Sequence, residues 1–136
     1  MTMVRTRQQR DLEIAVRHIR EVQTSPMTQT ERDRYGGLCH TFPILVLTNG
    51  LCQAVAFLAD KGANKPEGAH RTLLGHVAEL LEIDRSNLLS AIQNAAVLDY
   101  IRYSERIIEA WVFYKRFAVS MLDVDAGTRV DADGGA

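Results

Sequence analysis

Residues 42–62 read FPILVLTNGLCQAVAFLADKG, and this stretch decides the fold of the chain. Its first arm, 42–47, is compatible with a strand because it contains β-branched residues and leads to the hairpin dipeptide Asn49–Gly50. The second arm, 51–60, carries three alanines and shows no alternation of polar and apolar residues, which favours a helix. We therefore predict two consecutive buried helices that are broken near Thr48–Gly50.

The same stretch lies within a longer run, 35–59, that contains no formally charged residue and is long enough to span a bilayer. Proline and polar side chains interrupt this run, and each is costly in hydrocarbon unless it finds a partner. The interrupting residues are His40, Pro43, Thr48, Asn49, Gly50 and Gln53. The sequence thus favours buried helices of a soluble domain over a membrane span.

Helical periodicity also dominates the rest of the chain. Thr6 and Gln9 form a capping box that opens a helix reaching to about residue 23, and Ser25 before Pro26 predicts the start of a second helix near residue 26, weakened at Gly36–Gly37. Further helices are expected over 51–60 with Gly62 as terminator, over about 69–82, after residue 86, and over about 99–122, with a loop at 64–68. The prediction is an all-α fold, a compact bundle of about five to seven helices.

The 136 residues suffice for one domain, which we place at 1–122. Residues 123–136 carry four aspartates, one arginine and three glycines, so they are predicted to form a disordered acidic tail. The whole chain has a net charge of −1, but the part before the tail is slightly basic. Without a signal peptide, Cys39 and Cys52 are expected to be reduced thiols in a cytoplasmic protein.

The first predicted helix has two different faces. The apolar face holds Val4, Leu12, Ala15, Val16, Ile19 and Val22, and the opposite face holds Arg7, Arg10, Arg17 and Arg20 together with Glu13 and Glu21. Such a face is consistent with a solvated surface of Glu–Arg pairs within the helix. It is also consistent with contact to a phosphate backbone, because the guanidinium group donates bidentate hydrogen bonds and stays charged.

The last helix is apolar around most of its circumference over 107–122, which is typical of a central core helix or of a helix partly covered by a partner. Lys115 falls on the apolar side, where it can reach the edge of the helix or meet an acidic group or a phosphate.

Catalytic and metal-binding patterns are sparse. His70 and His76 are six residues apart, which does not place them on one helical face, and the two cysteines form no CxxC pair. The chain contains no HExxH, P-loop, GxGxxG or GxSxG motif. We expect no enzyme activity, no cofactor and no metal.

Three segments carry a family resemblance in their order and spacing: RTRQQR (5–10), the stretch 42–62, and YIRYSERIIEAWVFYKRFA (100–118). Together they resemble the small subunit of the Cmr complex, the type III-B CRISPR effector that targets RNA. This resemblance implies a small α-helical protein without cofactor or nuclease activity. It also implies that several copies stack into an inner filament, beside backbone subunits that hold the guide RNA and in contact with the large subunit.

If the resemblance holds, the expected partners are copies of the chain itself, the other Cmr subunits, the guide RNA and the target RNA, with no membrane. The contacts should go to phosphate and sugar, because a guide–target duplex must be held whatever its base sequence. The candidate RNA-binding residues are Arg7, Arg10, Arg17, Arg20, Lys61, Lys115 and Arg116, and the candidate interface residues are Trp111, Phe113, Tyr114 and Phe117.

Among other functions, a helical adaptor and a small enzyme remain open from the sequence, whereas a helix-turn-helix regulator is disfavoured. A helical adaptor would dock on another protein through 107–122 and never meet nucleic acid. A helix-turn-helix regulator would need an exposed polar recognition helix, for which 86–98 is too apolar. A small enzyme would use His70 or His76 with a remote carboxylate.

Overall fold

The computed structural model describes residues 5–123, which contain six α-helices, one 3₁₀ turn and no strand. The elements are α1 (Arg7–Thr24), α2 (Gln29–Asn49), α3 (Leu51–Gly62), α4 (Ala69–Leu81), η1 (Arg85–Asn87), α5 (Leu88–Gln93) and α6 (Val97–Leu122). The all-α prediction is confirmed. Val4 and the acidic tail from residue 124 onward lie outside the described residues. Within those residues, no helix combines the length and the apolar character that a membrane crossing requires.

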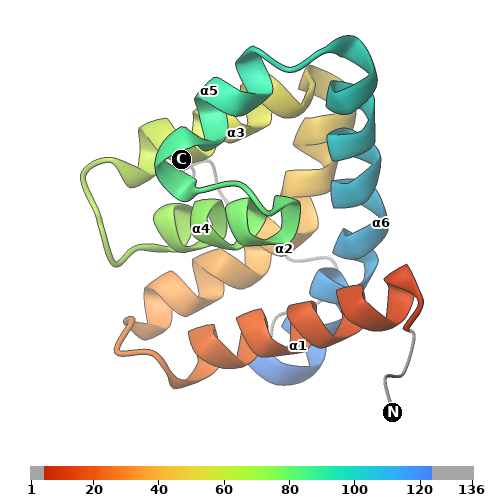
Figure 1. Cartoon of the computed structure of the whole chain (residues 1–136). Helices are drawn as coiled ribbons and strands as arrows, with labels where there is room; N and C mark the ends of the chain where they lie inside the picture. The colour runs from red at the N-terminus through yellow and green to blue at the C-terminus, as the bar shows by residue number, and fades with distance from the viewer. Residues whose placement is uncertain (1–4, 124–136) are drawn as a thin grey trace.

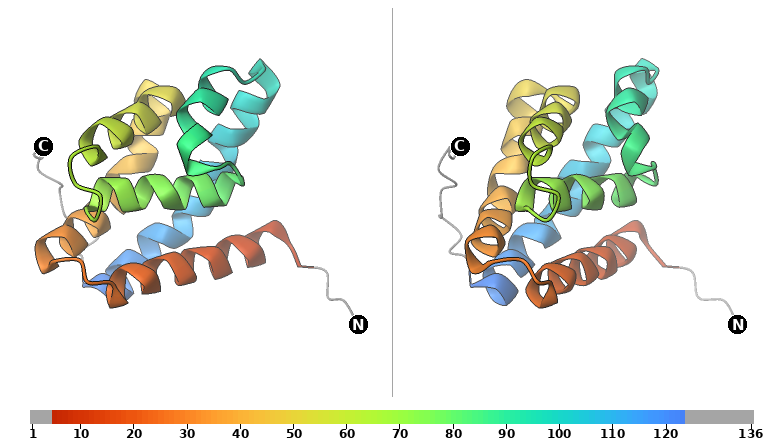
Figure 2. Two further views of the ribbon diagram at one scale, coloured as in Figure 1. Left: turned by 60° about the vertical axis from the view of Figure 1, so that its left-hand side comes forward. Right: turned by 90° about the vertical axis from the view of Figure 1, so that its left-hand side faces the viewer.

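The 26-residue helix α6 is the longest helix and the central element of the described fold (Figure 1). It packs mainly against α1 and α2, while α3 packs against α4 and α2. In the views of Figures 1 and 2, α1 and α3 lie at opposite ends of the molecule, with α4 between them. The core at the crossing of α2 and α6 contains Phe42 and Trp111, whose ring centroids are 5.1 Å apart. The central position predicted for the last helix is therefore correct.

The predicted break between two helices occurs at Gly50, which has φ +90° and separates α2 from α3. This positive φ favours glycine, and a Cβ atom here would also lie 3.3 Å from the Tyr100 hydroxyl. That hydroxyl accepts a hydrogen bond from the backbone N–H of Cys52 at 3.0 Å. Because Tyr100 satisfies an N–H in the first turn of α3, the break is fixed by α6 as well as by the glycine.

The start of the second helix was predicted wrongly. α2 begins at Gln29, where the Thr28 hydroxyl accepts from the backbone N–H of Glu31 at 3.2 Å. The Ser25 hydroxyl instead donates to the Val22 carbonyl at 2.8 Å, so it closes α1 rather than opening α2. From Gln29 the helix continues without a break through Gly36, Gly37 and Pro43, all three of which are buried. Tertiary packing thus outweighs the weak local helix propensity of this segment.

The buried face of α1 is rotated from the predicted one. Asp11 and His18 are buried together with Ala15, Ile19 and Val22, whereas Leu12 is 42% exposed and Val16 is half-buried. The physical reason is that Asp11 pairs with Arg106 and His18 bonds to Tyr114, both on α6. Two polar contacts therefore set the orientation of the helix in place of two aliphatic side chains.

Candidate nucleic-acid interface

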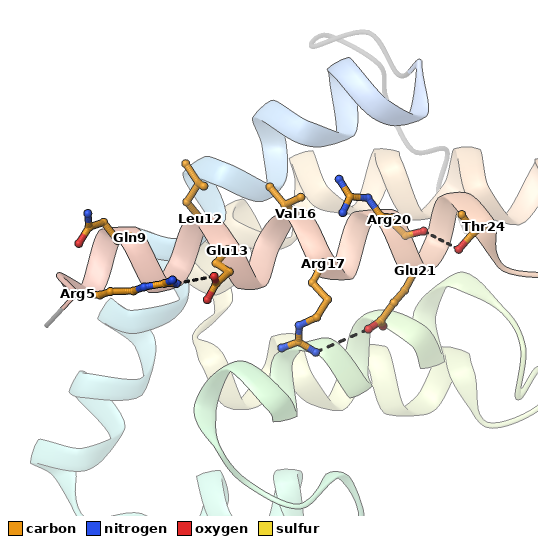
Figure 3. A pocket seen from close by; sticks show the side chains of 9 residues that line it. All are labelled: Arg5, Gln9, Leu12, Glu13, Val16, Arg17, Arg20, Glu21 and Thr24. Carbon is orange, nitrogen blue, oxygen red and sulfur yellow. Dashed lines mark hydrogen bonds and ion pairs between the residues drawn. The ribbon is translucent and has the colours of Figure 1, made fainter. Parts of the chain in front are cut away.

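The outer face of α1 borders an open hollow of about 630 Å³ (Figure 3). Within the described range, its lining comes only from α1 and Arg5. Leu12 and Val16 supply the apolar part of the surface, and Glu13, Arg17 and Glu21 extend along the other side of the helix. The capping box predicted at the start of this helix is present, with Thr6 Oγ1 accepting from the Gln9 N–H at 3.1 Å.

Acidic groups neutralise part of this basic face. Arg5 pairs with Glu13 at 2.5 Å, and Arg17 lies 2.5 Å from Glu79 on α4 and 3.8 Å from Glu21. The hydrogen bond to Glu79 raises the pKa of the Arg17 guanidinium, so this group stays charged but has a partner. Among the described residues, the predicted pairing within the helix is therefore found only for Arg17 and Glu21, whereas Arg5 precedes the helix and Glu79 comes from α4.

Two of the predicted arginines on α1 remain available. Arg10 and Arg20 are exposed, and neither forms an ion pair with any residue between 5 and 123. Arg7 differs, because it donates to Glu109 on α6 at 3.3 Å. The face thus presents two unneutralised guanidinium groups rather than four.

The remaining predicted cations are divided between two places. Lys115 and Arg116 are exposed on α6, and within the described part of the chain neither pairs with an acid. Lys61 is exposed near the C-terminal end of α3, and α3 lies at the opposite end of the molecule from α1 (Figures 1 and 2). The structure therefore does not gather all seven candidates into one site.

Two arginines that the sequence reasoning missed lie beside Arg7. Arg102 and Arg106 of α6 line a polar hollow of about 340 Å³ with Arg7, together with Tyr103 and Glu105. Arg106 pairs with the buried Asp11, and Arg102 is 3.9 Å from Asp99. In sequence, both arginines lie within a narrow polar arc of the last helix, but the sequence alone does not show that this arc faces the start of α1.

Two of the four predicted interface residues are in the core. Trp111 and Tyr114 are fully buried, with their rings stacked at a centroid distance of 4.0 Å, so they are not available to a partner. The helix turns these aromatics inward because they fill the space facing α1 and α2. Phe113 and Phe117 are half-buried. The apolar side chains that α6 exposes most in its middle and end are instead Val112 and Val119.

A buried polar cluster joins α1, α2, α4 and α6. The imidazole rings of His18 and His76 stack at 3.9 Å with 7° between their planes. Their Nδ1 atoms lie 2.6 Å from the hydroxyls of Tyr114 and Tyr35. His76 Nε2 lies 3.2 Å from the Glu21 carboxylate, so in the neutral ring this nitrogen carries the proton and donates to Glu21. The Tyr35 hydroxyl is then the donor to His76 Nδ1.

The contact of His18 with Glu79 is less direct. His18 Nε2 lies 3.1 Å from Glu79 Oε1 but not in line for a hydrogen bond, so this atom is unsatisfied among the described residues. Burial lowers the pKa of His18 and lowers that of His76 well below its ordinary value, the latter with a further contribution from the neighbouring His18. Burial acts to raise the pKa of the Glu79 carboxyl, but the contacts with Arg17 and His18 have a larger opposite effect, so the pKa is lowered. Burial therefore favours the uncharged form of both rings.

Reactive chemistry has little support in this arrangement. Over residues 5–123, no three His, Cys, Asp or Glu side chains are placed to hold one metal ion. Cys39 and Cys52 are free thiols, and burial raises the pKa of the Cys39 thiol, which suppresses the reactive thiolate. The exposed arginines and lysines can instead contact phosphate groups through charge-assisted hydrogen bonds.

Comparison with known proteins gives a consistent result. The chain matches the family described as "CRISPR-associated protein (Cas_Cmr5)" over residues 7–121. The CRISPR system Cmr subunit Cmr5 of Thermus thermophilus is 31% identical over 93 residues, which cover 68% of this chain and 78% of that protein.

A solved structure supports the same conclusion. The crystal structure of a CRISPR-associated Cmr5 family protein from Thermus thermophilus matches with a TM-score of 0.72 and 29% identity, covering 87% of this chain and 98% of that chain. The resemblance drawn from the three sequence segments is thereby confirmed. Since the family match spans α1 to nearly the end of α6, the chain belongs to the Cmr5 family of CRISPR-associated proteins.

Proposed function

We propose that this chain is a non-catalytic structural subunit of a type III-B (Cmr) ribonucleoprotein, in which copies of it stack into an inner filament. In this role it contacts the backbone of the target RNA or of the guide–target duplex. Family membership over residues 7–121 supports the assignment to the complex. The observation that supports RNA contact is the pair of exposed arginines on α1, Arg10 and Arg20, which have no acidic partner among residues 5–123.

In the proposed role, the weak RNA contacts of single copies add up along the filament. A subunit that must hold any guide–target duplex can use phosphate and sugar but not base edges. Two guanidinium groups give weak attraction in one copy, because the other two arginines of the face are paired, Arg7 with Glu109 and Arg17 with Glu79 and Glu21. Copies placed in a row would repeat these cations along the strand, so that affinity grows with the number of copies.

The low solvent exposure of two histidines supports the proposal that the chain is non-catalytic. The histidines of the buried cluster, His18 and His76, are 0% and 6% exposed, and their nitrogens face tyrosine and glutamate side chains. A general base must reach the proton that it abstracts. Cleavage of the target would then belong to another subunit.

The test measures RNA binding by the isolated chain and by an assembled complex. We expect weak binding of single-stranded RNA without sequence preference, with a logarithmic salt slope of about −0.7 per neutralised phosphate. The double variant Arg10→Glu/Arg20→Glu should weaken target binding by the complex and leave the helical content unchanged. Arg17 is avoided because its reversal would also disturb Glu79 on α4.

The matched control is Arg85→Glu, compared with each single reversal on α1. Arg85 is exposed in η1, which packs against α4 and α5, so its reversal changes the net charge equally but away from α1. If Arg85→Glu and Arg10→Glu weakened RNA binding equally, the loss would be explained by the change in net charge alone. That outcome would contradict an interface on α1. Unchanged target affinity in the double variant would contradict it as well.

An adaptor without nucleic-acid contact is the second candidate, favoured by the apolar side chains that α6 exposes, such as Val112 at 55%. It predicts partner binding that is insensitive to salt and no retention of RNA by the purified assembly. The salt series above separates the two functions.

A further inference from the structure

The outer face of α6 carries an ordered row of six side chains, of which the fold leaves five exposed. The row follows spacings of four and three residues, which keeps its members in one line along a helix. Its positions are Ile101, Glu105, Ile108, Val112, Lys115 and Val119. Ile101, Val112 and Val119 are 46%, 55% and 38% exposed, and Glu105 and Lys115 are also exposed, while Ile108 is half-buried.

This row is symmetric about Ala110. The two outer positions, Ile101 and Val119, are both apolar, and so are the two inner ones. The positions between them carry opposite charges, Glu105 on one side of the centre and Lys115 at the same distance on the other. Neither of these charged groups has an ion-pair partner between residues 5 and 123. The face is thus complementary to a reversed copy of itself.

We propose that two copies of the chain pair through this face, with their α6 helices antiparallel. In that arrangement each Ile101 packs on Val119 of the second copy, each Ile108 packs on Val112, and Glu105 meets Lys115 twice. A parallel pair would place Glu105 against Glu105 and Lys115 against Lys115, which like-charge repulsion disfavours. The charges therefore select the antiparallel orientation. Arg102, Glu109 and Arg116 stay at the exposed edge of the seam, where ion pairs contribute little.

Such a contact is isologous, because the same surface is used on both copies, and it closes at two. It differs from the open stacking proposed above, which must continue from copy to copy. The pair also covers Lys115, a candidate RNA contact, so it is a form of the free subunit that must separate before that lysine meets RNA. The inference does not rest on the proposed function, since it follows from α6 alone.

The test is the oligomeric state of the full chain by sedimentation equilibrium over a concentration series. The wild type should approach twice its monomer mass as concentration rises. Glu105→Lys and Lys115→Glu should each weaken the dimer by at least about tenfold, because each replaces two attractive contacts by two repulsive ones. Mixing these two single variants should restore a dimer of one copy of each, since both contacts then join opposite charges. The double variant Glu105→Lys/Lys115→Glu should also pair with itself.

The matched controls are Glu67→Lys and Lys61→Glu, which reverse exposed charges in the α3–α4 loop and in α3 and should leave the dimer unchanged. Circular dichroism checks that every variant keeps its helices. A monomeric wild type, single variants that dimerise normally, or a mixture that stays monomeric would each overturn the pairing. Assemblies larger than two that ignore these substitutions would overturn it in favour of open stacking, and RNA binding would remain a separate measurement.

Discussion

The rings of His18 and His76 stack face to face inside the protein, with 3.9 Å between their centroids. Each ring is held by a tyrosine hydroxyl, so a single cluster ties α1 and α4 to α6 and α2. Two stacked imidazoles tolerate each other while neutral, but two imidazolium ions at this distance would repel strongly. The packing of four helices therefore depends on the protonation of one buried pair.

The first prediction concerns pH. Unfolded histidine has a pKa near 6.5, and both buried histidines have lower pKa values in the folded protein. Between those values the unfolded chain binds more protons, so the free energy of unfolding falls as the pH drops below about 7. The expected slope reaches up to about 1.4 kcal/mol per pH unit for each histidine. Urea unfolding followed by the fluorescence of the single tryptophan, Trp111, at pH values from 7.5 to 5 measures it.

The variant His76→Gln tests the origin of this slope. It keeps a polar side chain in the cluster but cannot take up a proton, so the pH dependence should shrink even though the protein is less stable overall. A wild type that is equally stable, or more stable, at pH 5 than at pH 7 would show that the cluster does not control the acid response.

A second prediction concerns the pair of Asp11 and Arg106, which joins α1 to α6. Asp11 is 1% exposed, while the Arg106 side chain is 19% exposed. Asp11→Ala should lower the free energy of unfolding by about 2–3 kcal/mol, less than for a fully buried pair because Arg106 can reach water. The control is Glu13→Ala, which removes an exposed ion pair and should leave stability unchanged within error. Equal effects of the two variants in urea unfolding would contradict the importance of the buried pair.

A third prediction compares two glycines. Gly50→Ala should destabilise the protein by about 1–2 kcal/mol, because alanine disfavours a φ of +90° and its Cβ would press on Tyr100. Gly75→Ala lies inside α4, where the added Cβ meets Arg85 at an ordinary 3.6 Å. It should be neutral or stabilising, by up to about 1 kcal/mol, because alanine favours helix. Thermal unfolding of both variants gives the sign of each change in stability. Two changes of the same sign would refute the account of the α2–α3 break.

Much of the fold could be predicted because its signals are local. The Thr6 capping box depends on nearby residues, and Gly50 marks the helix break locally even though Tyr100 on α6 also helps to fix it; both features are present as predicted. The start of α2 and the orientation of α1 could not be predicted in the same way. Thr28 and Ser25 compete as caps with similar side chains, and the burial of His18 depends on a tyrosine 96 residues away.

Gly62 illustrates a prediction that was right for a different reason. The helix α3 ends at this residue as expected, but Gly62 does not have the positive φ that makes glycine a common helix terminator. A Cβ atom at this position would lie 2.9 Å from the backbone nitrogen of Arg71, so glycine allows α4 to approach α3 closely. Sequence shows where such a residue stands but not which backbone comes near it.

The candidate site was only partly predictable for a related reason. The arginines of α1 were visible in sequence, but which of them are neutralised depends on acids from other helices. Glu79 on α4 pairs with Arg17 and Glu109 on α6 pairs with Arg7, and neither contact has a local signal. The outward or inward direction of the aromatic residues on α6 likewise follows from packing, which buries Trp111 and Tyr114.

The most direct measurement of the central claim is purification of the tagged full chain from its native host, followed by identification of the proteins and nucleic acids that remain bound. The account predicts that larger Cmr subunits and short guide RNAs remain bound to the tagged chain and elute with it as one particle. Recovery of the chain without those subunits and without RNA, under conditions in which the host expresses its CRISPR system, would contradict it.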